Sequence, residues 1–142
     1  MYRTRRVSGF TLLEIMVVVV ILGVLAAIVT PGVLGAITDA RIEAAKSDIR
    51  TIESALTLYR MDNFRYPSTE LGLRALVERP PAADAPHWKS GGYLKKRKLP
   101  TDPWGNAYRY ANDGTEIDIY TLGSDRRPGG EGEAGDIHWI DL

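Results

Sequence analysis

Residues 9–29 have the sequence GFTLLEIMVVVVILGVLAAIV. From Phe10 onward this stretch is apolar apart from one charged side chain, Glu14. About 20 residues at a rise of about 1.5 Å each span about 30 Å, the thickness of a bilayer core. An ionised carboxylate in hydrocarbon costs roughly 3 kcal/mol or more. The stretch therefore predicts a membrane-spanning helix whose carboxylate near its start has a specific use.

The residues before this stretch are basic, since three arginines precede Gly9. Under the positive-inside rule they place the N-terminal end in the cytoplasm. A secretory signal peptide is the competing interpretation, but its apolar region is shorter, roughly 7–15 residues, and ends in a small-x-small cleavage site. The length of the apolar stretch and the position of Glu14 both disagree with that pattern. A plain transmembrane anchor stays open, although it explains neither Gly9 nor Glu14.

Composition limits the possible functions. The 142 residues are enough for one domain, and the 18 basic and 18 acidic side chains cancel. This balance gives no electrostatic footprint for nucleic acid, so we expect no nucleic-acid partner. Without the three N-terminal arginines the chain is acidic. Cysteine is absent, which excludes disulfides and thiolate chemistry. An exported domain of this kind needs another stabilising device, for example a metal ion.

The helix is expected to continue beyond the apolar stretch. Apolar residues with the spacing 3-4-3-4-3 predict an amphipathic helix that packs onto a small sheet; they are Ile42, Ala45, Ile49, Ile52, Leu56 and Tyr59. Pro31-Gly32 lies between the two halves, where proline removes a backbone donor, so a kink or local melting is expected there. The alternative is a simple break where the helix leaves the membrane.

The remaining sequence predicts small elements. A short helix is expected over Glu70–Val77, ended by Pro80-Pro81, and an irregular surface loop follows over Ala82–Gly92. Alternating residues on either side of Asn112-Asp113-Gly114 predict a β-hairpin whose second strand faces the long helix through Ile117, Ile119 and Thr121. A last extended segment is expected over Ile137–Ile140. The fold class is therefore α+β, with a long N-terminal helix and a small antiparallel sheet.

The segment Gly9-Phe10-Thr11-Leu12-Leu13-Glu14 resembles the processing site of the type IV pilin-like family. The resemblance implies that a prepilin peptidase cleaves after Gly9 and methylates the new N-terminal amine of Phe10. Glu14 is then the fifth residue of the mature chain, and in a filament it pairs with the Phe10 ammonium of a neighbouring subunit. Because an unpaired buried carboxylate is costly, such a pair would fix the register between subunits. The alternative is that Glu14 only extends to the membrane surface.

Three further segments narrow this resemblance to the major pseudopilin family of type II secretion systems. They are Tyr66-Pro67-Ser68-Thr69-Glu70-Leu71-Gly72-Leu73 with Ala75-Leu76-Val77, Leu99-Pro100-Thr101-Asp102-Pro103-Trp104-Gly105-Asn106, and Asp118-Ile119-Tyr120-Thr121-Leu122-Gly123-Ser124-Asp125. Type IV pilins proper usually close a disulfide loop near the C-terminus, and the absence of cysteine favours the pseudopilin family.

This resemblance implies a pilin-like lollipop with three parts: a leader peptide over residues 1–9, a transmembrane and assembly helix over 10–30, and a periplasmic head over 31–142. The implied function is structural, not enzymatic. The chain polymerises from the inner membrane into a periplasmic pseudopilus that drives folded proteins across the outer membrane. Implied partners are other copies of the chain, minor pseudopilins, the prepilin peptidase, and an inner-membrane assembly platform with its cytoplasmic ATPase.

The Gly-rich segment Gly123–Asp136 is the candidate for a bound ion, since carboxylates and glycine-rich carbonyls provide the hard oxygens that calcium prefers. Composition alone favours a solvated acidic turn over an ion site. The resemblance implies a structural Ca²⁺, held by the side chains of Asp125 and Asp136 and by the main-chain carbonyls of Leu122, Arg127 and His138. Two features depart from the family pattern: the adjacent cations Arg126-Arg127, and His138 at a position where small polar residues are commoner.

Two rival functions stay open at this stage. One is a type IV pilin of a surface filament that lacks the usual disulfide. The other is a membrane-tethered periplasmic binding domain, for which Glu14 would be dispensable. His87 and His138 stand apart in the sequence, so neither a catalytic triad nor a zinc cluster is indicated. The basic run Lys95–Lys98 is interpreted as a solvated surface, with contact to an acidic face of the next subunit as the alternative.

Overall fold

The structure is a computed structural model that describes residues 9–142, and for residues 28–34 it describes the backbone only. The part of the predicted leader before Gly9, with its three arginines, lies outside the described residues. The elements follow in the order α1 (Leu12–Asn63), η1 (Gly72–Leu76), β1 (Arg109–Asn112), β2 (Ile117–Thr121), η2 (Gly132–Ala134), β3 (Ile137–His138) and η3 (Trp139–Asp141), where η marks a 3₁₀ helix.

The chain divides into two units, one ending at Ile37 and the other running from Thr38 to Leu142. In the first unit, every described side chain from Phe10 to Ala27 is exposed. Among the residues that the structure describes, no helix meets the length and hydropathy needed for a membrane span.

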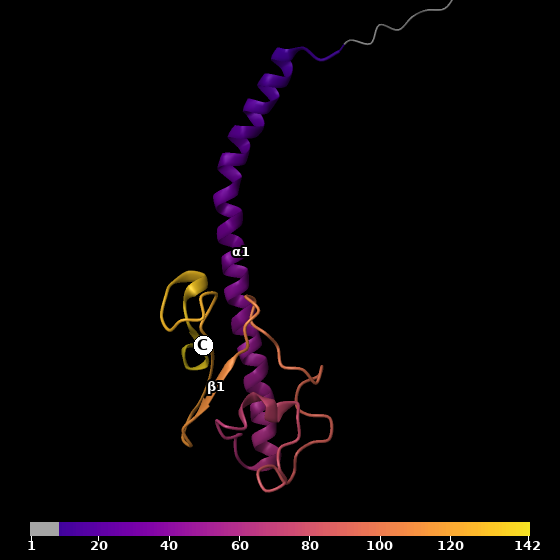
Figure 1. The fold of residues 1–142 in the computed structure, drawn as a ribbon, viewed down its shortest axis with the longest axis vertical. Helices are drawn as coiled ribbons and strands as arrows, with labels where there is room; N and C mark the ends of the chain where they lie inside the picture. The colour runs from indigo at the N-terminus through magenta and orange to yellow at the C-terminus, as the bar shows by residue number, and fades with distance from the viewer. Residues whose placement is uncertain (1–8) are drawn as a thin grey trace, which may run out of the picture. The chain divides into compact units, whose positions relative to one another are not determined.

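The helix α1 continues through Pro31 and Gly32 without interruption (Figure 1). The local melting expected at this point is therefore wrong for this structure. A proline inside a helix removes one hydrogen-bond donor and adds a local clash, but the turns on either side keep their own bonds. The residues next to Pro31, Thr30 and Gly32, are weak helix formers, so the helix continues here against its local propensity.

In the second unit, the predicted amphipathic stripe of α1 forms the core. Five of its six positions are buried, and Ile42, at the end nearest Thr38, is half-buried; the five are Ala45, Ile49, Ile52, Leu56 and Tyr59. Full burial of an aliphatic side chain contributes about 1.5–3 kcal/mol, so this stripe is a main source of stability for the unit.

The segment between α1 and the sheet is mostly irregular and passes around the last turns of α1 (Figure 1). The helix predicted over Glu70–Val77 is present but shorter, as the 3₁₀ helix η1. Its buried residues Leu73, Ala75 and Leu76 join the core.

The predicted hairpin is confirmed as β1 and β2, which pair antiparallel with Tyr110 opposite Ile119. Ile119 and Thr121 are buried, as expected for the strand face that packs on the helix. The extended segment expected over Ile137–Ile140 is strand only at β3, which completes a three-stranded sheet in the order β1-β2-β3. The 3₁₀ helix η3 replaces its second half. The fold is α+β, as predicted.

Candidate functional site

The predicted cleavage site lies just before the start of α1. Gly9, Phe10 and Thr11 are not helical, and the first helical residue is Leu12. Gly9 and Phe10 are exposed, Phe10 to 79%. The peptide bond between Gly9 and Phe10 is therefore in exposed, non-helical backbone, which is the form that a peptidase can bind.

Thr11 caps the helix, a role that the sequence analysis missed. Its hydroxyl accepts a hydrogen bond of 3.2 Å from the backbone N–H of Glu14. A Thr followed by Glu three residues later is the sequence pattern of a capping box, so the signal was present in Thr11-Leu12-Leu13-Glu14. Within residues 9–142 the Glu14 carboxylate makes no ion pair. The cap fixes where Glu14 lies on the helix and leaves its charge available.

The first turns of α1 carry an unusual number of exposed apolar side chains. Between 46% and 83% of each large apolar residue from Leu12 to Leu25 is exposed; these residues are Leu12, Leu13, Ile15, Met16, Val17, Val18, Val19, Val20, Ile21, Leu22, Val24 and Leu25. Apolar surface of this extent marks a site of protein or membrane interaction. We call residues 9–25 the N-terminal assembly segment.

The second candidate site is the C-terminal loop, residues 122–138. The loop is closed by the backbone, since Ser124 N–H donates to the Glu133 carbonyl at 2.8 Å. Gly123 has a φ of +64°, and a Cβ at this position would collide with that same carbonyl oxygen. The ion pair between Arg41 and Glu133, 2.9 Å long, ties the loop to α1. Position 123, where the loop begins, therefore requires glycine.

The predicted calcium ligands all lie on this closed loop or at its ends. Leu122 is buried directly after β2, and His138 ends β3. Asp125 and Arg127 are exposed and form a turn in which Asp125 Oδ1 accepts the Arg127 N–H at 2.9 Å. Asp136 Oδ2 accepts the Gly129 N–H at 2.8 Å. Sequence reasoning therefore placed the ligand candidates on one structural element.

One observation favours a cation in this loop. The second carboxylate oxygen of Asp136, Oδ1, is buried and has no hydrogen-bond partner among the described residues. A buried acceptor without a partner is rare and calls for an unseen donor or ion. The described part of the chain contains no group of three or more His, Asp or Glu side chains placed to hold a metal. A site here would therefore depend on the carbonyls of the predicted set.

His138 has a side-chain role that the sequence analysis missed. Its Nδ1 lies 2.6 Å from Asp118 Oδ2, and its ring stacks on Tyr120 with the ring centroids 4.8 Å apart. Asp118 and Tyr120 lie on β2, whereas His138 lies on β3. Through Nδ1, the histidine side chain therefore fastens β3 to β2.

Asp102 organises the turn that precedes the sheet. It is 3% exposed, and its Oδ1 accepts the N–H groups of Trp104 and Asn106 at 3.1 and 2.7 Å. Its Oδ2 accepts the Thr121 hydroxyl at 2.5 Å. The sequence analysis singled out this segment only for its family likeness. The pattern Asp-Pro-x-Gly, typical of an Asx turn, was the available signal.

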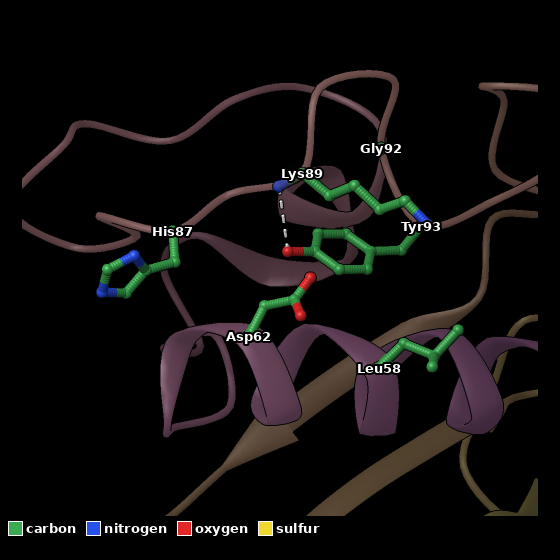
Figure 2. Close-up of a pocket in the computed structure, with 6 residues that line it drawn as sticks. All are labelled: Leu58, Asp62, His87, Lys89, Gly92 and Tyr93. Atoms are coloured by element: carbon green, nitrogen blue, oxygen red, sulfur yellow. Dashed lines mark hydrogen bonds between the residues drawn. The ribbon is translucent and has the colours of Figure 1, made fainter.

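A pocket of about 440 Å³ lies beside the C-terminal turns of α1, lined by Leu58, Asp62, His87, Lys89, Gly92 and Tyr93 (Figure 2). The Tyr93 hydroxyl accepts hydrogen bonds from Lys89 N–H and Asn63 Nδ2, both 3.1 Å long. Burial raises the pKa of Tyr93, which keeps the phenol protonated. Since these partners already satisfy Tyr93, we assign it to bracing the loop against α1. The run Lys95–Lys98 is fully exposed.

Comparison with known families matches both parts of the chain. The model described as "Type II secretion system (T2SS), protein G" matches residues 32–139. The model described as "Prokaryotic N-terminal methylation motif" matches residues 4–30, which include the predicted cleavage site.

Individual relatives agree with these matches. The chain is 52% identical over 136 residues to the type II secretion system core protein G of Pseudomonas aeruginosa, covering 94% of each protein. It is 48% identical to that of Vibrio cholerae, covering 96% of this chain and 94% of the relative. The solved major pseudopilin from the type 2 secretion system of enterohaemorrhagic Escherichia coli is 39% identical, with a TM-score of 0.65 over 77% of this chain and 94% of that one. The chain belongs to the protein G family of type II secretion systems, the major pseudopilins.

Proposed function

We propose that this chain is the polymerising subunit of a type II secretion pseudopilus, and that its growth drives folded proteins across the outer membrane. Its role is structural, and the energy for assembly comes from an ATPase acting through an inner-membrane platform. Other copies of the chain, minor pseudopilins and the prepilin peptidase are its further partners. The family membership supports the assignment to the secretion system.

The observation that carries the proposal is the exposed N-terminal assembly segment. Twelve large apolar residues from Leu12 to Leu25 have no packing partners that cover them. Each would gain about 1.5–3 kcal/mol on burial, so the segment is unstable in water. In our proposal it lies in the inner membrane before assembly, with the head in the periplasm, and in the filament core afterwards.

Glu14 gives this assembly its register. Apolar helices can slide past one another with little change in contact energy, because their side chains are similar along the segment. A carboxylate is different, since leaving it buried and unpaired costs about 3–5 kcal/mol. After cleavage the Phe10 amine, with a reference pKa of about 8, supplies a cation at a fixed position in the sequence, four residues before Glu14. Pairing Glu14 with the Phe10 ammonium of a neighbour then selects one axial offset.

We further propose that Ca²⁺ stabilises the C-terminal loop. The side chains of Asp125 and Asp136 and the carbonyls of Leu122, Arg127 and His138 would hold it. The buried, unpartnered Oδ1 of Asp136 supports this assignment. When bound, calcium would supply a cross-link between the start and the end of the loop. The loop residues themselves exclude water from Asp136 and keep β3 beside β2 through the Asp118–His138 pair.

The proposed function is tested by two measurements on the same strain. Mass spectrometry of the purified chain should find an N-terminal Phe10 that carries a methyl group. Glu14→Ala should abolish pseudopilus formation and reduce secretion of the system's substrates at least tenfold, whereas Glu116→Ala, which removes an acidic side chain from the hairpin turn, should leave both unchanged. Full secretion by Glu14→Ala would refute the register role. Surface filaments in a strain without the secretion channel would instead support a type IV pilin.

A further inference from the structure

A second pocket, about 450 Å³ in volume, lies at the C-terminal end of α1 and belongs entirely to the unit Thr38–Leu142. The last turns of α1 form one wall, and the segment from Phe64 to Ser68 forms another. The turn between β1 and β2 closes the third side. A volume of this size is typical of sites for small ligands or single side chains.

The floor of this pocket contains an unsatisfied donor. Tyr59 lines the pocket and is 0% exposed, and its hydroxyl has no hydrogen-bond partner among the described residues. Burial is the main cause that raises the pKa of Tyr59, so the phenol is a proton donor at neutral pH. Buried hydroxyls nearly always have a partner, and one without it points to a missing acceptor. Tyr93, which packs against Tyr59 with ring centroids 5.3 Å apart, accepts two hydrogen bonds at its hydroxyl oxygen.

Two guanidinium groups also line the pocket. Arg65 is held in place by the carbonyls of Ala83 and Asp84, which accept from its Nη2 at 2.7 and 2.9 Å. The Asp84 carbonyl also accepts from Nε at 3.2 Å, so Nη1 is the nitrogen without a partner in the described chain. The Arg60 guanidinium lies over the Tyr66 ring, 4.9 Å from its centroid, and makes no hydrogen bond or ion pair with the described residues. Asp84 contributes the pocket's one carboxylate, so the lining has an excess of one positive charge.

The rim of the pocket is apolar and strained. Phe64 is 84% exposed and has a φ of +63°, in the left-handed region at the position that follows α1. This position usually holds glycine or asparagine, since other residues pay a conformational cost there. Pro67 and Leu71 add further apolar surface. A strained, exposed aromatic side chain beside unpaired donors is the arrangement of a binding site.

We propose that this pocket binds a carboxylate that carries an apolar group, with Arg60, Arg65 and Tyr59 as donors to the carboxylate and Phe64 against the apolar group. The unpaired groups are all donors, so the ligand must be an acceptor. A carboxylate matches the planar geometry of guanidinium and is favoured by its charge. The proposed filament role does not use this site. The ligand is either the C-terminal residue of a polypeptide or a free organic acid.

The test is an NMR titration of the full chain in detergent micelles, following the Nε–H signals of Arg60 and Arg65. N-Acetylphenylalanine, which mimics a chain terminus, should shift both signals, whereas N-acetylphenylalaninamide, which lacks the carboxylate, should bind at least tenfold more weakly. 3-Phenylpropionate separates the two sources. If 3-phenylpropionate binds more weakly than N-acetylphenylalanine, the site is assigned to a chain terminus. If the two compounds bind equally, the site is assigned to a free acid.

Two variants test the donors. Tyr59→Phe should raise the Kd for N-acetylphenylalanine at least fivefold without lowering the unfolding midpoint, because the hydroxyl has no partner to lose. Arg60→Gln should raise this Kd at least tenfold. The matched control Arg74→Gln, which lies outside the pocket, should leave the Kd unchanged. The proposal is overturned if the acid and the amide bind equally, if neither binds, or if Tyr59→Phe leaves the Kd unchanged. A loss of stability in Tyr59→Phe would also overturn it, since the hydroxyl would then have a partner within the folded chain.

Discussion

Gly123 illustrates how a single position controls the C-terminal loop. Its positive φ disfavours any side chain, and an added Cβ would also collide with the Glu133 carbonyl. Gly123→Ala should therefore lower the free energy of unfolding by about 2 kcal/mol or more. Gly114 also has a positive φ, +92°, but faces open space. Gly114→Ala should cost only about 1 kcal/mol. Urea unfolding of both variants measures the difference, and equal losses would contradict the role of the close contact.

Replacing Asp102 should also have a large effect on the free energy of unfolding. Its carboxylate accepts three hydrogen bonds, including one from the buried Thr121 hydroxyl. Asp102→Ala leaves these donors without partners and should lower the free energy of unfolding by about 3 kcal/mol. Glu70→Ala, an exposed acidic residue, serves as the control in the same urea titration. A loss below about 1 kcal/mol for Asp102→Ala would show that water replaces the carboxylate.

Buried tyrosines predict how stability depends on pH. Burial raises the pKa of Tyr108 and Tyr110 well above the usual value of about 10, and for Tyr108 the nearby Asp48 carboxylate adds to the effect. Above pH of about 10 the unfolded chain loses these protons first, so the folded state binds more protons and its stability falls as the pH rises. Stability should change little from this cause below pH of about 10.

The prediction is checked by urea unfolding at a series of alkaline pH values. Tyr108→Phe removes one of the groups, so its stability should fall less steeply with pH above about 10 than that of the unchanged chain. The comparison uses slopes, because the variant also loses the hydrogen bond to Asp48 and with it some stability at neutral pH. Identical slopes would contradict the assignment.

Some residues could be predicted from the sequence, and others could not. The N-terminal methylation motif, which a family model matches over residues 4–30, depends only on the local order of residues along the chain. The contact between Asp118 and His138 joins residues far apart in sequence, and nothing in either neighbourhood specifies the other. Tyr59 is a mixed case, because the apolar spacing correctly placed its side chain in the core. Its unpaired hydroxyl depends on the loops that surround it.

At the scale of elements, the long helix and the hairpin were the most predictable. The 3.6-residue period of the helix and the alternation on each side of Asn112-Asp113-Gly114 are properties of local sequence, and both were confirmed. A kink or local melting was expected at Pro31, and the melting was wrong, because the helix runs through this position. The length of β3 depends on pairing with β2, which sequence alone does not specify.

The C-terminal loop predicts a response to calcium. If the proposed ion binds the folded chain only, calcium at about 100 times its Kd should stabilise that state by about 2.7 kcal/mol, and a chelator should reverse this. Asp136→Asn should lose the response, whereas Glu131→Gln, on the same loop, should keep it. Thermal unfolding with and without calcium measures both. A thermal midpoint that ignores calcium and chelator alike would exclude a structural ion.

At the scale of the whole molecule, a charge introduced into the exposed apolar surface should prevent pseudopilus formation. Val20 is 64% exposed and lies on the N-terminal assembly segment. In the proposed filament, Val20→Asp would bury a carboxylate without a paired cation, at a cost of about 3 kcal/mol or more. Pseudopili should therefore be absent in electron micrographs, and secretion should be lost. Val20→Leu should retain both, and filament formation by Val20→Asp would contradict a buried apolar contact.

The helix cap at Thr11 has a consequence for the chemistry of the new chain end. Under the proposed cleavage after Gly9, Phe10 would be the single residue before the cap, so the free ammonium would lie beside the positive end of the helix dipole. That end repels a cation, and Thr11 already occupies one of the N–H groups there. A methylated amine keeps its positive charge, which the N-terminal end of the helix dipole disfavours. An acidic side chain close to the amine can offset this cost. In the proposed filament, the Glu14 carboxylate of a neighbouring copy would offset this cost in addition to the chain's own Glu14, which lies in the first turn of α1.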